Sequence, residues 1–328
     1  MPSLPPFSRR ALLGGVAALA APLVARAQAD FPTRPIRMIV PSAAGSGQDI
    51  LARVVAQRLS ELWGQPVVVE NRVGAGGTIG SDLIAKAPRD GYTIGVINSS
   101  SMAISPALLP SVPYDPLTSF TPLGLGAAND CALAVKADSP FRGVADVVAA
   151  AKARPGQLTW ASAGSGTSTH MAGELFRLEA GVDVVHVPYR GSPAALTALL
   201  GGQVDMLFNT INSLLAAVRN DQIRALASTG RSRDPLLPDV PSFVEAGFAA
   251  YEASGWLGFA GPAGLPPEVL RKLSEGIRQV TRSEPFQQAM ITAGMRPQSS
   301  TAQEFQDYMA VEIGRWRDIA RRSGAKMD

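Results

Sequence analysis

Residues 36–49 read IRMIVPSAAGSGQD, and this stretch decides the fold class. The β-branched run Ile36–Val40 predicts a buried strand, which leads through a Gly/Ser loop into an amphipathic run from Asp49 to Trp63. The same order returns at residues 158–170, LTWASAGSGTSTH, where a second Gly/Ser loop precedes a helical pattern. Two strand–loop–helix units of this kind, one in each half, predict an α/β fold.

Short strands alternate with helical stretches along most of the chain after Asp30. This alternation is typical of folds with mainly parallel sheets flanked by helices. Further strands are predicted at residues 67–70, 93–97, 131–135, 184–187, 204–208 and 223–228. Further helices are predicted at residues 79–86, 144–153, 169–179, 193–200, 268–281, 285–293 and 305–322.

Residues 1–29 have the pattern of an export signal rather than of a domain. Arg9 and Arg10 precede the apolar run Ala11–Ala25, which is short for a membrane span, and small residues follow it. The arginine pair resembles a twin-arginine signal, and an ordinary Sec signal is the alternative. We therefore expect export to the periplasm, with cleavage near Ala29.

The formal net charge of +3 belongs to this leader. Residues 1–29 contain three arginines and no acidic residue, so their removal leaves the 27 acidic residues balanced by basic ones. A neutral mature chain, whose four tryptophans do not cluster with basic residues, argues against nucleic-acid binding. The hydrophobic content of 46% excludes an intrinsically disordered chain. The lone Cys131 predicts a buried, small apolar side chain.

The two Gly/Ser loops are the candidate binding site. Each follows the carboxyl end of a predicted strand and opens a helix, where backbone N–H groups lack internal partners and the helix dipole is positive. Such a place holds an anion without Lys or Arg, and two of them can converge on one ligand. The candidate residues are Ser42, Ala43, Ala44, Gly45, Ser46, Gly47, Asp49, Gly164, Ser165, Gly166, Thr167, Ser168 and His170. For Asp49, helix capping is an alternative role.

Other kinds of chemistry have little support in the sequence. His170 and His186 lie far apart with no carboxylate at ligand spacing, so no metal site is predicted. No nucleotide motif is complete, and we expect no cofactor. A serine hydrolase using Ser165 or Ser168 with His170 is an alternative, although no Gly-x-Ser-x-Gly motif is present.

Four stretches resemble the Bug-type extracytoplasmic solute receptors, the substrate-binding proteins of tripartite tricarboxylate transporters. They are residues 32–49, 65–80 (QPVVVENRVGAGGTIG), 161–192 (ASAGSGTSTHMAGELFRLEAGVDVVHVPYRGS) and 237–247 (LPDVPSFVEAG). Shorter matches at residues 90–93, 113–116 and 201–205 extend the similarity over essentially the whole mature chain.

This resemblance implies a two-lobed periplasmic-binding-protein fold of type II-like form, with a ligand cleft between the lobes. It suggests residues 30–129 plus 253–328 for lobe one and residues 130–252 for lobe two. It places a ligand carboxylate between the two Gly/Ser loops and adds Ser99, Ser100 and Asn209 to the wall of the site. The implied function is capture of a small organic acid and its delivery to a membrane permease, by a protein that we expect to be monomeric.

Two departures from the family pattern bear on the ligand. Ser42 replaces an aromatic residue, and Asn209 stands where the family usually has Asp. The lost negative charge disfavours a ligand ammonium, so we expect a plain mono- or dicarboxylate rather than an amino acid. A sensor that delivers its ligand signal to a receptor is the alternative function.

Overall fold

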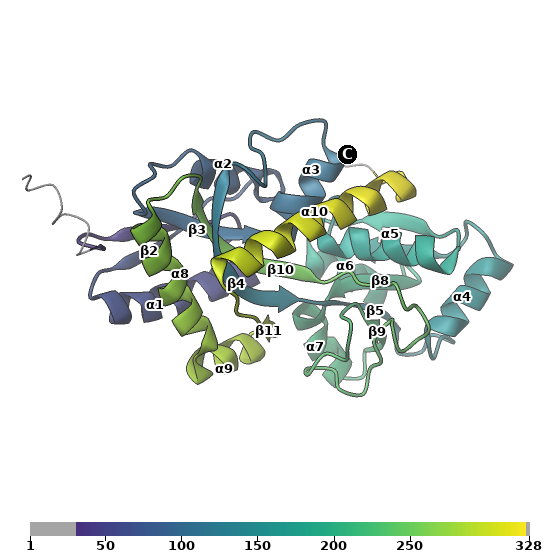
Figure 1. Cartoon of the computed structure of the whole chain (residues 1–328). Coiled ribbons are helices and arrows are strands. Elements are labelled where there is room, and N and C mark those ends of the chain that lie inside the picture. The colour runs from purple at the N-terminus through teal and green to yellow at the C-terminus, as the bar shows by residue number, and fades with distance from the viewer. Residues whose placement is uncertain (1–30, 326–328) are drawn as a thin grey trace, which may run out of the picture.

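The computed structural model describes residues 31–325, so the predicted export signal lies outside the described residues. Two sheets with their covering helices lie side by side as two lobes (Figure 1). The first sheet contains, in spatial order, β11 (Arg296–Pro297), β4 (Phe120–Asn129), β10 (Gly255–Pro262), β3 (Thr93–Asn98), β1 (Ile36–Val40) and β2 (Val67–Asn71). The second contains β7 (Val185–Pro188), β6 (Thr159–Ser162), β8 (Met206–Thr210), β5 (Cys131–Lys136) and β9 (Ile223–Ser228).

Helices cover both sheets. Those of the first lobe are α1 (Gly47–Trp63), α2 (Thr78–Ala85), α3 (Ser105–Leu108), α8 (Pro267–Arg282) and α9 (Glu284–Thr292), with single turns at Ala75–Gly77 and Ser100–Ile104. Those of the second are α4 (Val144–Ala153), α5 (Ser168–Ala180), α6 (Ser192–Leu200) and α7 (Ile211–Arg219). The last helix is α10 (Ala302–Ser323). Within residues 31–325, no helix has the length and apolar character needed to cross a membrane.

The sheets are mixed, whereas the sequence pattern predicts mainly parallel ones. β1 pairs in parallel with β2 and β3, and β6 pairs in parallel with β7 and β8. The pairings of β10 with β3 and β4, and of β5 with β8 and β9, are antiparallel. The physical reason in the first sheet is that β4 carries the chain out of the first lobe and β10 carries it back, so β10 runs opposite to both β4 and β3.

The two lobes are joined where β4 passes into β5 with only Asp130 between them. Asp130 is buried, and Arg296 of β11 donates from Nη2 to its Oδ2 at 3.1 Å. The neighbouring Cys131 is buried as predicted, and burial raises the pKa of its thiol to about 12. The chain returns through residues 252–254 into β10, so two segments form the connection.

The long helix α10 contributes to the cores of both lobes and runs along them (Figure 1). Near its start, Phe305 and Met309 pack against Trp256 of β10 in the first lobe. Farther along, Trp316 and Ile319 belong to the core cluster that contains side chains of α5 and β8. The residue limits of the two lobes that were inferred from the sequence remain a prediction. They assign α10 to lobe one, although α10 also packs against lobe two.

Candidate functional site

The loops predicted to bind an anion extend from strands that run in parallel. Within the first sheet, β1 and β3 end at Val40 and Asn98, so the loops that follow them leave the same edge. In the second sheet the same holds for β6, β7 and β8. The two edges meet beside Gly255 at the start of β10. A Cβ atom added to this glycine would lie 3.5 Å from the Ser99 hydroxyl oxygen of the first edge and 3.5 Å from the Ser168 hydroxyl oxygen of the second. Sequence positions 99 and 168 therefore come together at the junction of the lobes.

The first loop is held in shape by its own side chains. Ser46 caps α1 and accepts a hydrogen bond from the Asp49 N–H at 3.3 Å. The hydroxyls of Ser42 and Ser46 are 2.7 Å apart. Ala43, Ala44 and Gly45 form the exposed tip, while Ser42, Ser46 and Gly47 are half-buried. The loop therefore presents its backbone at the start of a 17-residue helix.

Asp49 supports this loop from beneath. Its Oδ2 accepts from the Gly45 N–H at 2.8 Å and from Arg53 Nε at 2.9 Å, and its Oδ1 accepts from Asn71 at 3.0 Å. Burial raises the pKa of the Asp49 carboxyl, but these hydrogen bonds outweigh it and leave the pKa below its ordinary value. Both carboxylate oxygens of Asp49 therefore have protein partners and hold the tip of the loop, whereas Ser46 is the cap of α1.

The second loop is organised in the same way. Thr167 caps α5, accepts from the His170 N–H at 3.2 Å and donates its hydroxyl to the Gly164 carbonyl at 2.7 Å. Gly166 has φ +75°, a left-handed conformation that a β-branched residue adopts only with strain. Gly164, Ser165, Thr167 and Ser168 are half-buried, and Gly166 is buried. The start of α5 thus carries accessible hydroxyls and backbone groups.

His170 belongs to the support of this loop rather than to a catalytic pair. Its Nδ1 accepts from the Gly166 N–H at 3.2 Å, and its Nε2 lies 3.9 Å from Glu174 Oε1. The ring stacks on His186 with centroids 4.3 Å apart, and His186 stacks on Trp160. Burial, aided by His170, lowers the pKa of His186 to about 3, so His186 is neutral near pH 7. Both ring nitrogens of His170 face the loop and its own helix, and this does not favour a serine hydrolase.

The remaining predicted wall residues have unequal roles. Ser99 is buried and Ser100 half-buried at the end of β3. Asn209 is fully buried: its Oδ1 accepts from the Ser192 hydroxyl at 2.6 Å and from the Thr210 N–H at 2.9 Å, and its Nδ2 donates to the Ser192 carbonyl at 3.1 Å. Asn209 therefore fixes the start of α6 relative to β8.

Three further polar residues lie at this edge and were not among the predicted site residues: Gln48, Asn98 and Ser192. Asn98 donates to Gln48 Oε1 at 3.1 Å and so links the loops after β1 and β3. Ser192 opens α6 and holds Asn209. All three directly follow or end a strand or open a helix, and polar residues at such positions are the signal that could have identified them.

The site can hold an anionic group but offers no metal centre. Residues 42–49 and 164–170 contain no Lys or Arg, and the nearby Arg53 is paired with Asp49. Across residues 31–325 no group of three His, Cys, Asp or Glu side chains could hold a metal ion. Backbone N–H groups and hydroxyls at two helix starts are what remains to contact a ligand.

Comparison with known proteins identifies the family. Residues 51–325 match the model of the tripartite tricarboxylate transporter family receptor. The chain belongs to this family. The receptor is 35% identical to the protein BugT of Bordetella pertussis over 312 residues, which cover 95% of each chain.

Two solved structures resemble the receptor in fold. The protein Rpa4515 of Rhodopseudomonas palustris, solved with adipate, has a TM-score of 0.81 and 32% identity, with 91% of the receptor and 100% of that chain covered. MatC (Rpa3494) of the same organism, solved with malate, has a TM-score of 0.75 and 29% identity, with 88% and 99% covered. The two-lobed fold and the receptor function expected from the sequence are thereby confirmed.

Proposed function

We propose that this receptor captures a small organic carboxylate between the loops at residues 42–49 and 164–170. The observation that carries the proposal is the meeting of the two loop edges over Gly255, with the hydroxyls of Ser99 and Ser168 on either side. The adipate and malate in the two related structures are small dicarboxylates and support the same class of ligand.

The binding energy would come from oriented dipoles. A helix start contributes about 0.3–1 kcal/mol toward an anion at an exposed site and up to about 2 kcal/mol at a partly buried one. Hydroxyls of Ser42, Ser46, Ser165 and Ser168 add hydrogen bonds to a carboxylate. Because no buried ion pair has to be broken, release is easier than from a site built on Lys or Arg.

A plain mono- or dicarboxylate fits the site better than an amino acid. Asp49 is the acidic residue of the first loop, and its carboxylate oxygens are both bonded to the protein. Asn209 is neutral and is fully engaged with Ser192 and Thr210. A ligand ammonium would therefore meet no available negative charge among these residues.

Capture would proceed by closure of the lobes without covalent chemistry. Residues 30–129 plus 253–328 would move as one lobe and residues 130–252 as the other, with the junction at Asp130 and at residues 252–254 as the hinge. We place the receptor in the periplasm as a monomer, with its leader cleaved near Ala29. The closed complex would be recognised by the membrane components of a tripartite tricarboxylate transporter.

A thermal-shift panel on the dialysed mature protein tests the ligand class. Adipate, malate and succinate are compared with aspartate and glutamate at equal concentration and pH. We expect simple dicarboxylates to raise the melting temperature more than either amino acid. A larger shift with aspartate or glutamate than with any simple carboxylate would refute the assignment, and native mass spectrometry of the undialysed protein would show which acid co-purifies.

A glycine substitution tests the site itself. Gly166→Val places a β-branched residue at φ +75° in the loop, so we expect at least a tenfold loss of affinity for the best carboxylate of the panel. Gly202→Val is the matched control, because Gly202 has φ +69° and open space around it outside both loops. Calorimetric titration giving equal affinities for the two variants would contradict the site.

A further inference from the structure

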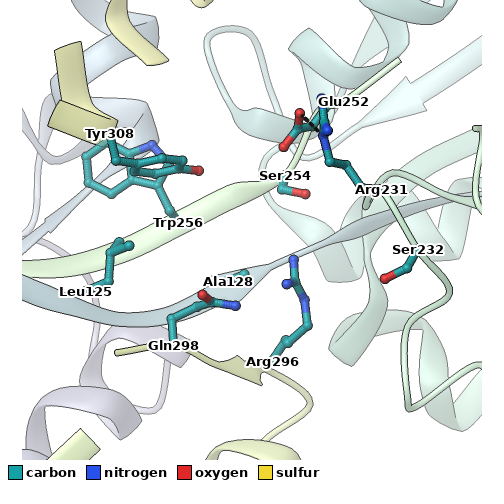
Figure 2. Close-up of a pocket in the computed structure, with 10 residues that line it drawn as sticks. All are labelled: Leu125, Ala128, Arg231, Ser232, Glu252, Ser254, Trp256, Arg296, Gln298 and Tyr308. Carbon is teal, nitrogen blue, oxygen red and sulfur yellow. Dashed lines mark hydrogen bonds and ion pairs between the residues drawn. The ribbon is translucent and has the colours of Figure 1, made fainter. Parts of the chain in front are cut away.

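A pocket of about 240 Å³ lies beside β10, where Ser254 and Trp256 are among the residues that line it (Figure 2). Side chains alternate along a strand, so Ser254 and Trp256 point away from the face on which Gly255 meets Ser99 and Ser168. Ser254 and Trp256 both line this pocket, which we call the hinge pocket. The hinge pocket and the proposed carboxylate site therefore lie back to back across the strand that joins the lobes.

Both lobes supply walls of the hinge pocket. Leu125 comes from β4, Arg296 from β11 and Tyr308 from α10. Arg231 and Ser232 come from the segment after β9 in the second sheet. The shape of the hinge pocket consequently depends on how the two lobes are placed.

Five neutral side chains with a polar group in the hinge pocket have no hydrogen-bond partner for that group among residues 31–325. They are Ser232, Ser254, Trp256, Gln298 and Tyr308. The indole Nε1 of Trp256 is buried, and a buried polar atom without a partner is unusual in folded proteins. Burial raises the pKa of Tyr308 to about 12, so its hydroxyl remains a neutral donor at physiological pH.

Two guanidinium groups supply N–H donors, and each is paired with a carboxylate. Arg296 uses Nε and Nη2 on Asp130, which leaves Nη1 without a partner in the described chain, and the group points into the space between Gln298 and Ser232 in Figure 2. Arg231 is held through Nε by Glu252 at 2.8 Å. Glu252 is also paired with Arg315 at 3.1 Å, and Arg315 is paired with Glu312, so the charges of these side chains balance. The hinge pocket therefore offers a carboxylate unpaired N–H and O–H donors rather than an excess of positive charge.

The floor of the hinge pocket is apolar and includes Leu125, Ala128 and the Trp256 indole. A cavity of about 150 Å³ is large enough for benzene. The hinge pocket is larger and thus has room for a ring with one carboxylate. We propose that the hinge pocket is a second ligand site, which binds a small carboxylate with an apolar body, of the size of benzoate, independently of the two loops.

Occupancy of the hinge pocket has a consequence for the hinge. A ligand that contacts Arg296 and Tyr308 on one side and Ser232 on the other stabilises the lobe arrangement in which those walls are apposed. By linkage, a ligand in the hinge pocket changes the affinity of the proposed carboxylate site by a certain factor. A carboxylate bound at the two loops changes the affinity of the hinge pocket by the same factor. The second site would therefore act as an effector site for capture.

Fluorine NMR with 4-fluorobenzoate on the full mature chain tests the proposal. Ser232→Phe blocks the hinge pocket, and Ser111→Phe is the matched control, because both serines are exposed in loops and neither makes a side-chain hydrogen bond in the described chain. We expect saturable millimolar or tighter binding, weakened at least tenfold by Ser232→Phe and unchanged by Ser111→Phe. Tyr308→Phe removes one hydroxyl and keeps the ring, so it should weaken 4-fluorobenzoate binding about threefold. This second variant still tests the hinge pocket if Ser232→Phe fails to fold.

The same titration with Gly166→Val separates the two sites. Unchanged 4-fluorobenzoate affinity in this variant is expected, because the hinge pocket contains no residue of the loops. Loss of binding in Gly166→Val, with retention in Ser232→Phe, would show that the probe enters the proposed carboxylate site and would overturn the proposal. Absence of saturable binding to the unsubstituted protein would also overturn it, and neither result depends on which acid the loops capture.

The effect on the hinge has its own measurement. Spin labels on Lys86→Cys and Lys152→Cys, exposed residues of the first and second lobe, report the distance between the lobes, and the buried Cys131 would not be labelled. A narrower distance distribution with 4-fluorobenzoate is expected. An unchanged distribution at saturating probe would refute the effector role.

Discussion

At the scale of single residues, the loops are shaped by side chains that do not themselves face a ligand. Asp49 receives the Gly45 N–H, and His170 receives the Gly166 N–H, so each loop has one backbone donor tied to a residue in the first turn of its own helix. These contacts pre-organise the other N–H groups of each loop, and pre-organised dipoles lose little on binding. The sequence predicts which residues lie in the loops and offers a supporting role for Asp49, but only the structure shows that Asn209 holds the start of α6.

Asp49→Asn should destabilise the protein in a pH-dependent way. The pKa of Asp49 is lowered in the folded state, so its contribution is present above the ordinary Asp pKa of about 4 and is lost as the pH falls through the folded pKa. Loss of charged hydrogen bonds to Arg53 and Gly45 should cost about 1–3 kcal/mol near pH 7. Urea denaturation of both proteins between pH 7 and pH 3 measures the difference, which should shrink below about pH 4.

Asp138→Asn is the control for this prediction. The Asp138 side chain is 73% exposed, with a surface ion pair to Lys136, so its replacement should change stability by less than about 0.5 kcal/mol. A difference between wild type and Asp49→Asn that stays constant over the whole pH range would show that charge at Asp49 is not the cause.

At the scale of elements, the periodic helices and the β-branched strands were predictable, and β4 and α7 were not. β1, α4 and β9 have the bounds predicted from the sequence. β4 contains Pro122, Gly124 and Gly126, which read as a turn or loop. It is a strand because β10 and β11 pair with it on both sides, and such long-range pairing leaves no local pattern.

The element that joins the two cores gives a stability prediction. Trp316 of α10 is fully buried among side chains of the second lobe, and its Nε1 donates to Glu312 at 3.2 Å. Trp316→Ala should cost about 3–5 kcal/mol, because a large cavity is left behind. Hydrogen exchange should speed up in α5 more than in β1, since α5 packs against this part of α10.

Val311→Ala on the same helix is the matched control. Val311 is 69% exposed, so its truncation should change stability by about 0.5 kcal/mol or less. Equal destabilisation by the two substitutions, or uniform acceleration of exchange in both lobes after Trp316→Ala, would contradict the assignment of this half of α10 to the second core.

At the scale of the whole molecule, the net charge of the chain does not explain the proposed binding of an anion. The excess of basic residues lies in residues 1–29, and the rest of the chain is balanced. The proposed site attracts an anion through backbone dipoles at α1 and α5 rather than through net charge. Both helix starts are predictable from the sequence. The approach of Ser99 and Ser168 beside Gly255 is not, because it depends on the relative placement of the two lobes.

The central claim is that backbone N–H groups of both loops bind one carboxylate, and amide NMR of the ¹⁵N-labelled mature protein tests it most directly. The titration uses adipate and malate in parallel. We expect the amide protons of Gly47 and Gln48 in α1 and of Ser168 and Thr169 in α5, which have no hydrogen-bond partner among residues 31–325, to move downfield together with a common saturation point. Shifts confined to one loop, or an absence of shifts in both loops while the acid still binds, would contradict it.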